Sequence, residues 1–362
     1  MLTDRFTRIH DYLRIAVTDR CNFRCAYCKP APLEREPEEG IALLPRTDLL
    51  TFEEIASLAA VFVRLGVRKI RITGGEPLVR RGIETLFEML SGIDGLNELA
   101  LSTNGLLLEE NLPMLWKHGV HQLNISLDTL RPERFLSITG VGACDAVQHA
   151  IRAAVRYRMG FESFRSIKIN MVVMRGINDD ELLDFVRFGE ELRALAENGP
   201  QIEIRFIEFM PFPRNGWDET RCITSSEMMA RIQAAYPLRR VERASPPAVG
   251  QPSLATPDDD GIRGPAKSFE VNGANFRIGF IPTVSEPFCH ACSRLRCAAD
   301  GTLRTCLFGQ DGLNLRDMLR NGANGDTMAS AIHSALQEKW FEHPPAHLLA
   351  ELNTREMISI GG

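Results

Sequence analysis

The chain has 362 residues, of which 44% are hydrophobic and 25% charged, a composition typical of soluble globular proteins. Its formal net charge is -5, which argues against a nucleic-acid or anionic-membrane partner. The first residues are polar and charged, and the longest apolar stretch, near residues 55–63, is too short to span a bilayer. We therefore expect a cytoplasmic protein with one large or two ordinary domains.

Short apolar strands alternate with helices up to about residue 210. Residues 13–18 are the first predicted strand, and they lead into a cysteine-containing loop. Thr51, with Glu54 three residues later, predicts a capped helix that runs to about residue 65. The other predicted elements of this part are strand 67–73, helix 82–90, strand 96–102, helix 107–118, strand 122–127, helix 145–157, strand 167–173, helix 180–195 and strand 202–209.

Six strands joined by helices indicate a parallel α/β sheet. A closed barrel of this kind needs eight strands, so we expect a partial, open (β/α)6 TIM-like barrel. Its ligand should lie at the carboxyl ends of the strands. The polar motifs there are Cys21, Gly74-Gly75-Glu76-Pro77, Thr103-Asn104-Gly105 and Ser126-Leu127-Asp128.

The alternation stops near residue 211, which divides the chain into a barrel domain (1–210) and a smaller C-terminal domain (211–362). Segments 30–48 and 244–266 are rich in loop-forming residues such as Pro and read as surface loops. Strand pairs are predicted at 269–280 and 295–306, the second with an Asp300-Gly301 turn, and short helices at 315–320 and 327–339.

Seven of the nine cysteines form two groups. Cys21-x3-Cys25-x2-Cys28 offers three thiolates, whereas a tetrahedral zinc site needs four ligands. A [4Fe–4S] cluster can be held by three cysteines, which leaves one iron open to an outside ligand. In a cytosolic chain such groups favour metal ligation over disulfides, so we expect two metal centres. The second group, for which a four-cysteine zinc site is the alternative, contains Cys289, Cys292, Cys297 and Cys306, while Cys144 and Cys222 read as buried thiols.

The cysteine loop at 18–28, followed by Gly74-Gly75-Glu76-Pro77, resembles the radical S-adenosylmethionine (SAM) superfamily. The spacing Cys289-x2-Cys292-x13-Cys306, the pair Arg294-x-Arg296 and the Gly361-Gly362 end narrow the resemblance to the GTP 3′,8-cyclase family of molybdenum cofactor biosynthesis. The resemblance implies that SAM binds the open iron of the first cluster and yields a 5′-deoxyadenosyl radical. This radical would abstract the ribose 3′ hydrogen of GTP, and the product would be (8S)-3′,8-cyclo-7,8-dihydroguanosine 5′-triphosphate.

The resemblance also assigns residues to roles. The ligands would be Cys21, Cys25 and Cys28 for the first [4Fe–4S] cluster and Cys289, Cys292 and Cys306 for the second, with Cys297 left over. SAM contacts would be Tyr27, Gly75, Ser126 and Met210. GTP contacts would be Arg14, Arg71, Ser102, Lys168, Arg294, Leu295 and Arg296, with Arg205 as a further candidate. Catalytic positions would be Arg14, Arg71, Arg294, Arg296, Gly361 and Gly362.

The implied partners are an electron donor and a downstream pterin-forming enzyme, and the implied assembly is a monomer or a homodimer. Two alternatives remain open at this point. One is another radical SAM enzyme with an auxiliary cluster, such as a peptide maturase. The other is a non-catalytic iron–sulfur or zinc protein. Each basic residue taken alone would be an ordinary solvated surface charge. The prediction of a GTP site therefore depends on the whole group of basic residues named above.

Overall fold

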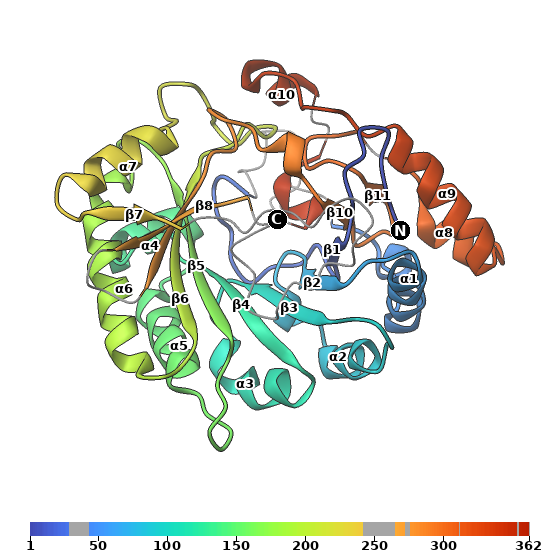
Figure 1. The fold of residues 1–362 in the computed structure, drawn as a ribbon, viewed down its shortest axis with the longest axis horizontal. Coiled ribbons are helices and arrows are strands. Elements are labelled where there is room, and N and C mark those ends of the chain that lie inside the picture. Colours follow the sequence, from blue (N-terminus) through green and yellow to red (C-terminus); the bar gives the residue numbers. More distant parts are fainter. Residues whose placement is uncertain (29–42, 242–264, 272–275, 311, 353–354, 362) are drawn as a thin grey trace.

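The computed structural model describes residues 1–28, 43–241, 265–271, 276–310, 312–352 and 355–361. Most of loop 30–48, most of segment 244–266, and Gly362 therefore lie outside the described residues. In the described part, an eleven-stranded sheet curves into an open barrel wall (Figure 1), with the strand order β11-β10-β1-β2-β3-β4-β5-β6-β9-β8-β7. None of the helices described there combines the length and the apolar character that crossing a bilayer requires.

The six predicted strands form the parallel centre of this sheet, as expected. They are β1 (Tyr12–Ala16), β2 (Lys69–Thr73), β3 (Glu98–Thr103), β4 (Val120–Ser126), β5 (Ser166–Val173) and β6 (Gln201–Glu208). The intervening helices are α1 (Phe52–Arg64), α2 (Ile83–Ser91), α3 (Leu108–Lys117), α4 (Pro132–Thr139), α5 (Cys144–Arg156) and α6 (Leu182–Ala196). Figure 1 shows α1, α2, α3, α5 and α6 on the outer side of the sheet.

Helix α1 begins where its capping residues predict. Glu54 N donates to Thr51 Oγ1 at 3.2 Å, and Thr51 N donates to Glu54 Oε2 at 2.8 Å. Helix α4 was not predicted. It starts with Pro132 in its first turn and ends at Gly140, whose φ of 70° is left-handed, so both ends carry ordinary helix signals.

Residues after 210 extend the sheet at both of its edges. β9 (Arg277–Ile281) runs parallel to β6, and β8 (Lys267–Val271) and β7 (Leu238–Arg240) follow it in antiparallel order. At the other edge β10 (Arg294–Cys297) runs parallel to β1, and β11 (Leu303–Arg304) pairs antiparallel with β10. The two strand pairs are thus confirmed, but their attachment to the barrel was not predicted. The remaining helices are α7 (Ser225–Gln233), α8 (Leu315–Arg320), α9 (Gly325–Gln337) and α10 (Ala346–Leu352).

Alternation along the strands separates an apolar outer face from a polar inner face. In β1, Leu13 and Ile15 belong to the main buried apolar cluster, whereas Tyr12 and Arg14 line a cavity on the opposite face. Closed barrels of this type fill their interior with apolar side chains. Here polar and charged side chains occupy those positions, so the barrel interior remains available for a ligand.

Candidate active site

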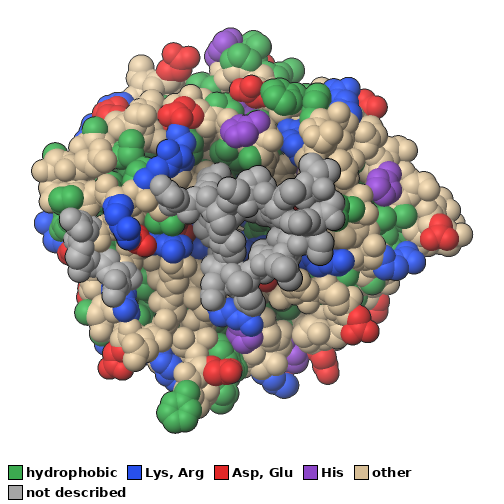
Figure 2. Space-filling model, in the orientation of Figure 1, with side chains coloured by type: hydrophobic (Ala, Val, Ile, Leu, Met, Phe, Trp, Pro, Cys, Tyr) green, Lys and Arg blue, Asp and Glu red, His purple; other side chains and the backbone are tan. Residues whose placement is uncertain are grey.

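The inner face of the barrel encloses a cavity of about 710 Å³, which is within the usual size range of ligand pockets. Figure 2 shows Lys and Arg side chains on the face of the molecule that looks into the barrel. Nearly all the candidate residues line this cavity: Arg14, Cys21, Cys25, Tyr27, Cys28, Arg71, Gly75, Ser102, Ser126, Lys168, Arg205, Met210, Cys289, Cys292, Arg294, Arg296 and Cys306. The structure therefore brings both cysteine groups and the basic set into one space.

The first cysteine loop is held against the barrel by its backbone. Gly75 N donates to Thr18 O at 2.7 Å, and a Cβ on Gly75 would lie only 2.3 Å from Arg20 O. Position 75 thus excludes a side chain because the chain itself approaches closely. On the other side, Arg24 N donates to Thr139 O at 2.8 Å, so the last turn of α4 supports the loop.

The three thiols of this loop line one cavity, where they can bind a common iron–sulfur cluster, although burial opposes their ionisation before a metal is bound. Burial, with Cys21 and Asp128 nearby, raises the pKa of Cys28 to about 12, and burial also raises the pKa of Cys25 well above its usual value. A metal centre supplies the positive charge that such thiols need to ionise. Among the described residues, no three His, Cys, Asp or Glu side chains converge on a single ion. In a [4Fe–4S] cluster each cysteine binds a different iron, so such convergence is not required.

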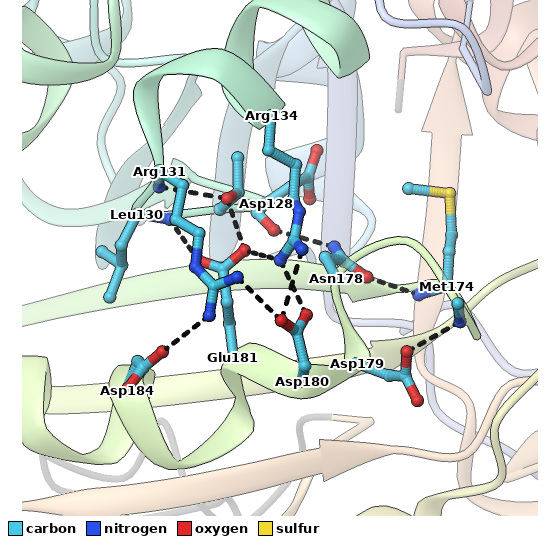
Figure 3. Close-up of polar contacts among 12 residues, drawn as sticks. Asp128, Leu130, Arg131, Arg134, Met174, Asn178, Asp179, Asp180, Glu181 and Asp184 are labelled. Atoms are coloured by element: carbon cyan, nitrogen blue, oxygen red, sulfur yellow. Dashed lines mark hydrogen bonds and ion pairs between the residues drawn. The ribbon is translucent and has the colours of Figure 1, made fainter.

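Tyr27 ties this loop to the ends of β4 and β5. Its hydroxyl donates to Asp128 Oδ2 at 2.6 Å, and Val172 N donates to Asp128 Oδ1 at 2.9 Å. Asn178 Nδ2 donates to the backbone oxygen of Asp128 at 2.7 Å, and Asn178 Oδ1 accepts from Met174 N at 2.7 Å (Figure 3). The loop that follows β4 is therefore fixed beside the cysteine loop.

A second network in Figure 3 anchors α4 itself. Glu181 is fully buried and accepts from Thr129 Oγ1 at 2.6 Å, from Leu130 N at 2.7 Å and from the guanidinium of Arg134. Arg134 also donates to Asp180 Oδ1 at 2.7 Å. Because α4 in turn supports the cysteine loop, this network contributes to the loop's position. No predicted motif included it.

The second cysteine group separates into three cavity residues and one core residue. Cys289, Cys292 and Cys306 line the cavity, whereas Cys297 is 2% exposed and lies in the apolar core. In β10 the side chains of Arg294 and Arg296 face the cavity, and alternation places Leu295 in the core with Cys297. The predicted GTP contact at Leu295 is therefore not a side-chain contact with this cavity.

The two cysteine groups lie at opposite ends of the strands. The first group follows the end of β1. Cys289 and Cys292 precede β10, whose first residue pairs with Tyr12 at the start of β1. Five residues of strand at roughly 3.3 Å each place about 16 Å of barrel between these ends.

A row of three arginines, which we call the arginine row, crosses the space between the two groups. Arg14 pairs in register with Arg296 on one side and with Arg71 on the other. Burial, together with the neighbouring arginine charges, lowers the pKa of Arg14 to about 10 and that of Arg296 well below its usual range. Although burial opposes it, Arg71, Arg14 and Lys69 lower the pKa of Tyr12 to about 7. The row thus concentrates positive charge that an anionic ligand would neutralise.

The described end of the chain reaches the same place, and Figure 1 shows its last turn (red) inside the ring of strands. Thr73 Oγ1 donates to Gly361 O at 2.9 Å, and Arg14 Nη2 donates to it at 3.3 Å. Gly361 has a φ of 80°, and a Cβ there would lie 2.8 Å from Ala16 Cβ. Glycine is the residue that fits both conditions.

Comparisons with known proteins agree with this geometry. The family model of the radical SAM superfamily matches residues 15–189, and that of molybdenum cofactor synthesis C matches residues 202–345. Crystal structures of Streptococcus suis SuiB resemble the fold at 12% identity. The form bound to SAM has a TM-score of 0.53 and covers 91% of this chain and 68% of that one. The form bound to its precursor peptide SuiA has a TM-score of 0.56, with 92% and 68% covered.

Curated relatives match over the whole length of this chain. The GTP 3′,8-cyclase of Moorella thermoacetica is 39% identical, with 100% of both chains covered. The mitochondrial GTP 3′,8-cyclase of Arabidopsis thaliana is also 39% identical and is covered to 84%. Molybdenum cofactor biosynthesis protein 1 of Mus musculus is 41% identical, and the chain spans 51% of its length. Radical SAM membership implies a [4Fe–4S] cluster and SAM as cofactors, and the chain belongs to the GTP 3′,8-cyclase family of molybdenum cofactor biosynthesis.

Proposed function

We propose that this chain converts GTP to (8S)-3′,8-cyclo-7,8-dihydroguanosine 5′-triphosphate. The observation that carries the proposal is the arginine row, Arg296, Arg14 and Arg71, which lies in one cavity between two three-cysteine groups. A row of buried guanidiniums suits a triphosphate, because each offers a planar fork of donors to phosphate oxygens. The family's named activity fits this charge distribution.

In this proposal Cys21, Cys25 and Cys28 hold the first cluster, and Tyr27, Gly75, Ser126 and Met210 surround SAM. When bound, this cluster supplies the electron that cleaves SAM to the 5′-deoxyadenosyl radical. The protein positions the reactants, since the radical must meet the ribose 3′ carbon and little else. The basic residues hold the triphosphate through charge and orientation, with no proton transfer assigned to them.

The second cluster belongs to the same proposal, with Cys289, Cys292 and Cys306 as its ligands and the purine of GTP next to it. Their three thiols face the cavity, and despite burial the charges of Arg294 and Lys339 lower the pKa of Cys292 to about 7, which favours a thiolate ligand. Residues 1–210 would then carry SAM, and residues 211–362 would complete the GTP site. An electron donor and a pterin-forming enzyme that takes the product complete the proposed context.

The test is an anaerobic incubation of reconstituted protein with SAM, a strong reductant and GTP, followed by chromatography and mass spectrometry. The hydrogen taken by the radical is replaced at the end of the reaction, so the product should be an isomer of GTP with unchanged mass. We expect 5′-deoxyadenosine and this isomer to appear together and only when GTP is present. If 5′-deoxyadenosine forms equally without GTP and no isomer appears, the SAM chemistry stands and the GTP assignment is wrong.

A further inference from the structure

Lys339 is a buried cation that no predicted motif included. It follows the end of α9 and is 3% exposed. Lysine is rarely buried to this extent without partners, because its ammonium loses its hydration there. Its neighbours therefore indicate what it does.

All three donors of the Lys339 ammonium have acceptors in the segments that carry the second cysteine group. Nζ donates to Cys292 Sγ at 3.9 Å, to Arg294 O at 3.2 Å and to Thr305 O. Thr305 immediately precedes Cys306. One side chain thus joins two of the three segments around the proposed second cluster, one before β10 and one after β11, at the open end of this hairpin.

The remaining ligand is held by a second cation. Arg8 Nη1 donates to Cys289 O at 2.6 Å, and the Arg8 guanidinium also donates to Phe341 O at 2.8 Å and to Trp340 O at 2.7 Å. Residues 340 and 341 directly follow Lys339. The frame around Cys289, Cys292 and Cys306 is therefore assembled on the short segment 339–341.

A cluster held by these ligands would lie next to the Lys339 ammonium. Its Nζ is 3.9 Å from Cys292 Sγ and also donates to the backbone oxygen of Thr305, the residue before Cys306. Positive charge and hydrogen bonds to cluster sulfurs both stabilise the reduced form of an iron–sulfur cluster, which carries one more negative charge. A buried ammonium at this place should therefore affect both the retention and the potential of the cluster.

We propose that Lys339 is a positioning residue of the second [4Fe–4S] cluster, which holds the segments of Cys292 and Cys306 together and raises the reduction potential of the cluster. This inference rests on the second cluster of the proposed function. Lys339 faces the ligand frame and not GTP, so its effect on the reaction would pass through the cluster.

The experiment uses the full chain with Cys21, Cys25 and Cys28 all changed to Ala, so that bound iron reports on the second group alone. In this background Lys339→Met removes the charge and the donors, and Lys339→Arg keeps the charge. We expect Lys339→Met to weaken iron retention about 10–100-fold in competition with a chelator. Where cluster remains, its midpoint should fall by about 59 mV, which is a tenfold change for one electron.

The control is Lys117→Met, the same substitution at a lysine whose side chain is 67% exposed. We expect this control to match the background and Lys339→Arg to recover most of the iron. A background protein that holds no iron would refute the second cluster itself. Background iron that Lys339→Met leaves unchanged, in both amount and midpoint, would overturn only the role of Lys339. Equal loss in Lys339→Met and Lys339→Arg, with the melting temperature of both apo-proteins lowered, would make the residue merely structural.

Discussion

Like charges that face each other across neighbouring strands destabilise a sheet, and Arg14 has an arginine on both sides. Such a site binds anions well but lowers the stability of the fold. Removing an arginine from it should therefore weaken anion binding without lowering the melting temperature.

The double variant Arg294→Ala, Arg296→Ala tests this at the GTP site. Each charge-assisted hydrogen bond contributes about 1.5–3 kcal/mol, so we expect GTP affinity to fall by roughly 100-fold or more. The melting temperature should hold or rise, because like-charge repulsion with Arg14 is removed. Anaerobic titration calorimetry and thermal unfolding give the two values, and Arg187→Ala, whose side chain is 61% exposed, serves as the control. Unchanged GTP affinity would contradict the site.

The described end of the chain offers a second test. In Gly361→Ala the new methyl group would meet Ala16 at 2.8 Å in a left-handed backbone conformation, so the tail should leave the arginine row. We expect turnover to fall at least tenfold with iron content unchanged. Gly322→Ala is the matched control, since its φ is 79° but no atom lies within 4 Å of the added Cβ. Equal losses in both variants would mean that backbone strain alone is responsible.

At the scale of single residues, the sequence predicted those site residues that belong to a local spacing pattern. Spacing located the cysteines, and Arg294 and Arg296 are two residues apart, which is the spacing of side chains on one face of a strand. The same spacing places Leu295 and Cys297 on the other face of the strand, so it already argued against a GTP contact at Leu295. Lys339 had no such signal, because its partners at 292, 294 and 305 become its neighbours only after folding.

Among the elements, helix α4 connects the Glu181 network to the cysteine loop. Arg134, near the start of α4, is bonded to Glu181. At the end of α4, the backbone oxygens of Thr139 and Ile138 accept hydrogen bonds from Arg24 N and Ala26 N of the cysteine loop. Phe135 packs edge-on against Phe23 in the same loop. A short helix thus links a network that is remote from the cavity to the first cluster.

Glu181→Ala should therefore affect both stability and cluster binding. The change leaves Thr129 Oγ1 and Leu130 N without their acceptor, and each hydrogen bond lost to a charged group costs about 1.5–3 kcal/mol, which should appear as a lower free energy of unfolding in urea. We expect iron reconstitution at the first group to fall as well, because α4 loses its anchor. Glu191→Ala, which breaks an exposed pair with Arg152, should change neither quantity measurably. If stability falls while the iron content stays full, the Glu181 network does not contribute to binding of the first cluster.

Helix α1 and strands β1 to β6 were predictable because their signals lie within a few residues, as in the capping box of Thr51 and Glu54. Helix α4 was missed although Pro132 and Gly140 mark its ends, since eight residues offer little periodicity. The attachment of β9 and β10 could not be predicted in this way. Their partners β6 and β1 are distant in the chain, and pairing between remote strands leaves no periodic pattern.

For the whole molecule, the C-terminal strands protect both edges of the barrel sheet. A chain that ends at residue 210 would expose β1 and β6 as open edges with their apolar faces incompletely covered. We expect this truncated chain to be largely insoluble and the full chain to unfold in one cooperative transition. Solubility after expression and calorimetric unfolding of the apo-protein test this expectation. A soluble, folded fragment 1–210 would instead favour two independent domains.

The pairing of β1 with β10 also means that β1 is synthesised long before its partner strand. Tyr12 pairs with Arg294, so about 280 residues separate the two partners in the chain. At roughly 5–20 residues per second, β1 waits about 14 to 56 s before its partner strand is made. During that time a strand with the buried residues Leu13 and Ile15 has one unprotected edge. The nascent chain should therefore depend on chaperones until just over four-fifths of it has been translated.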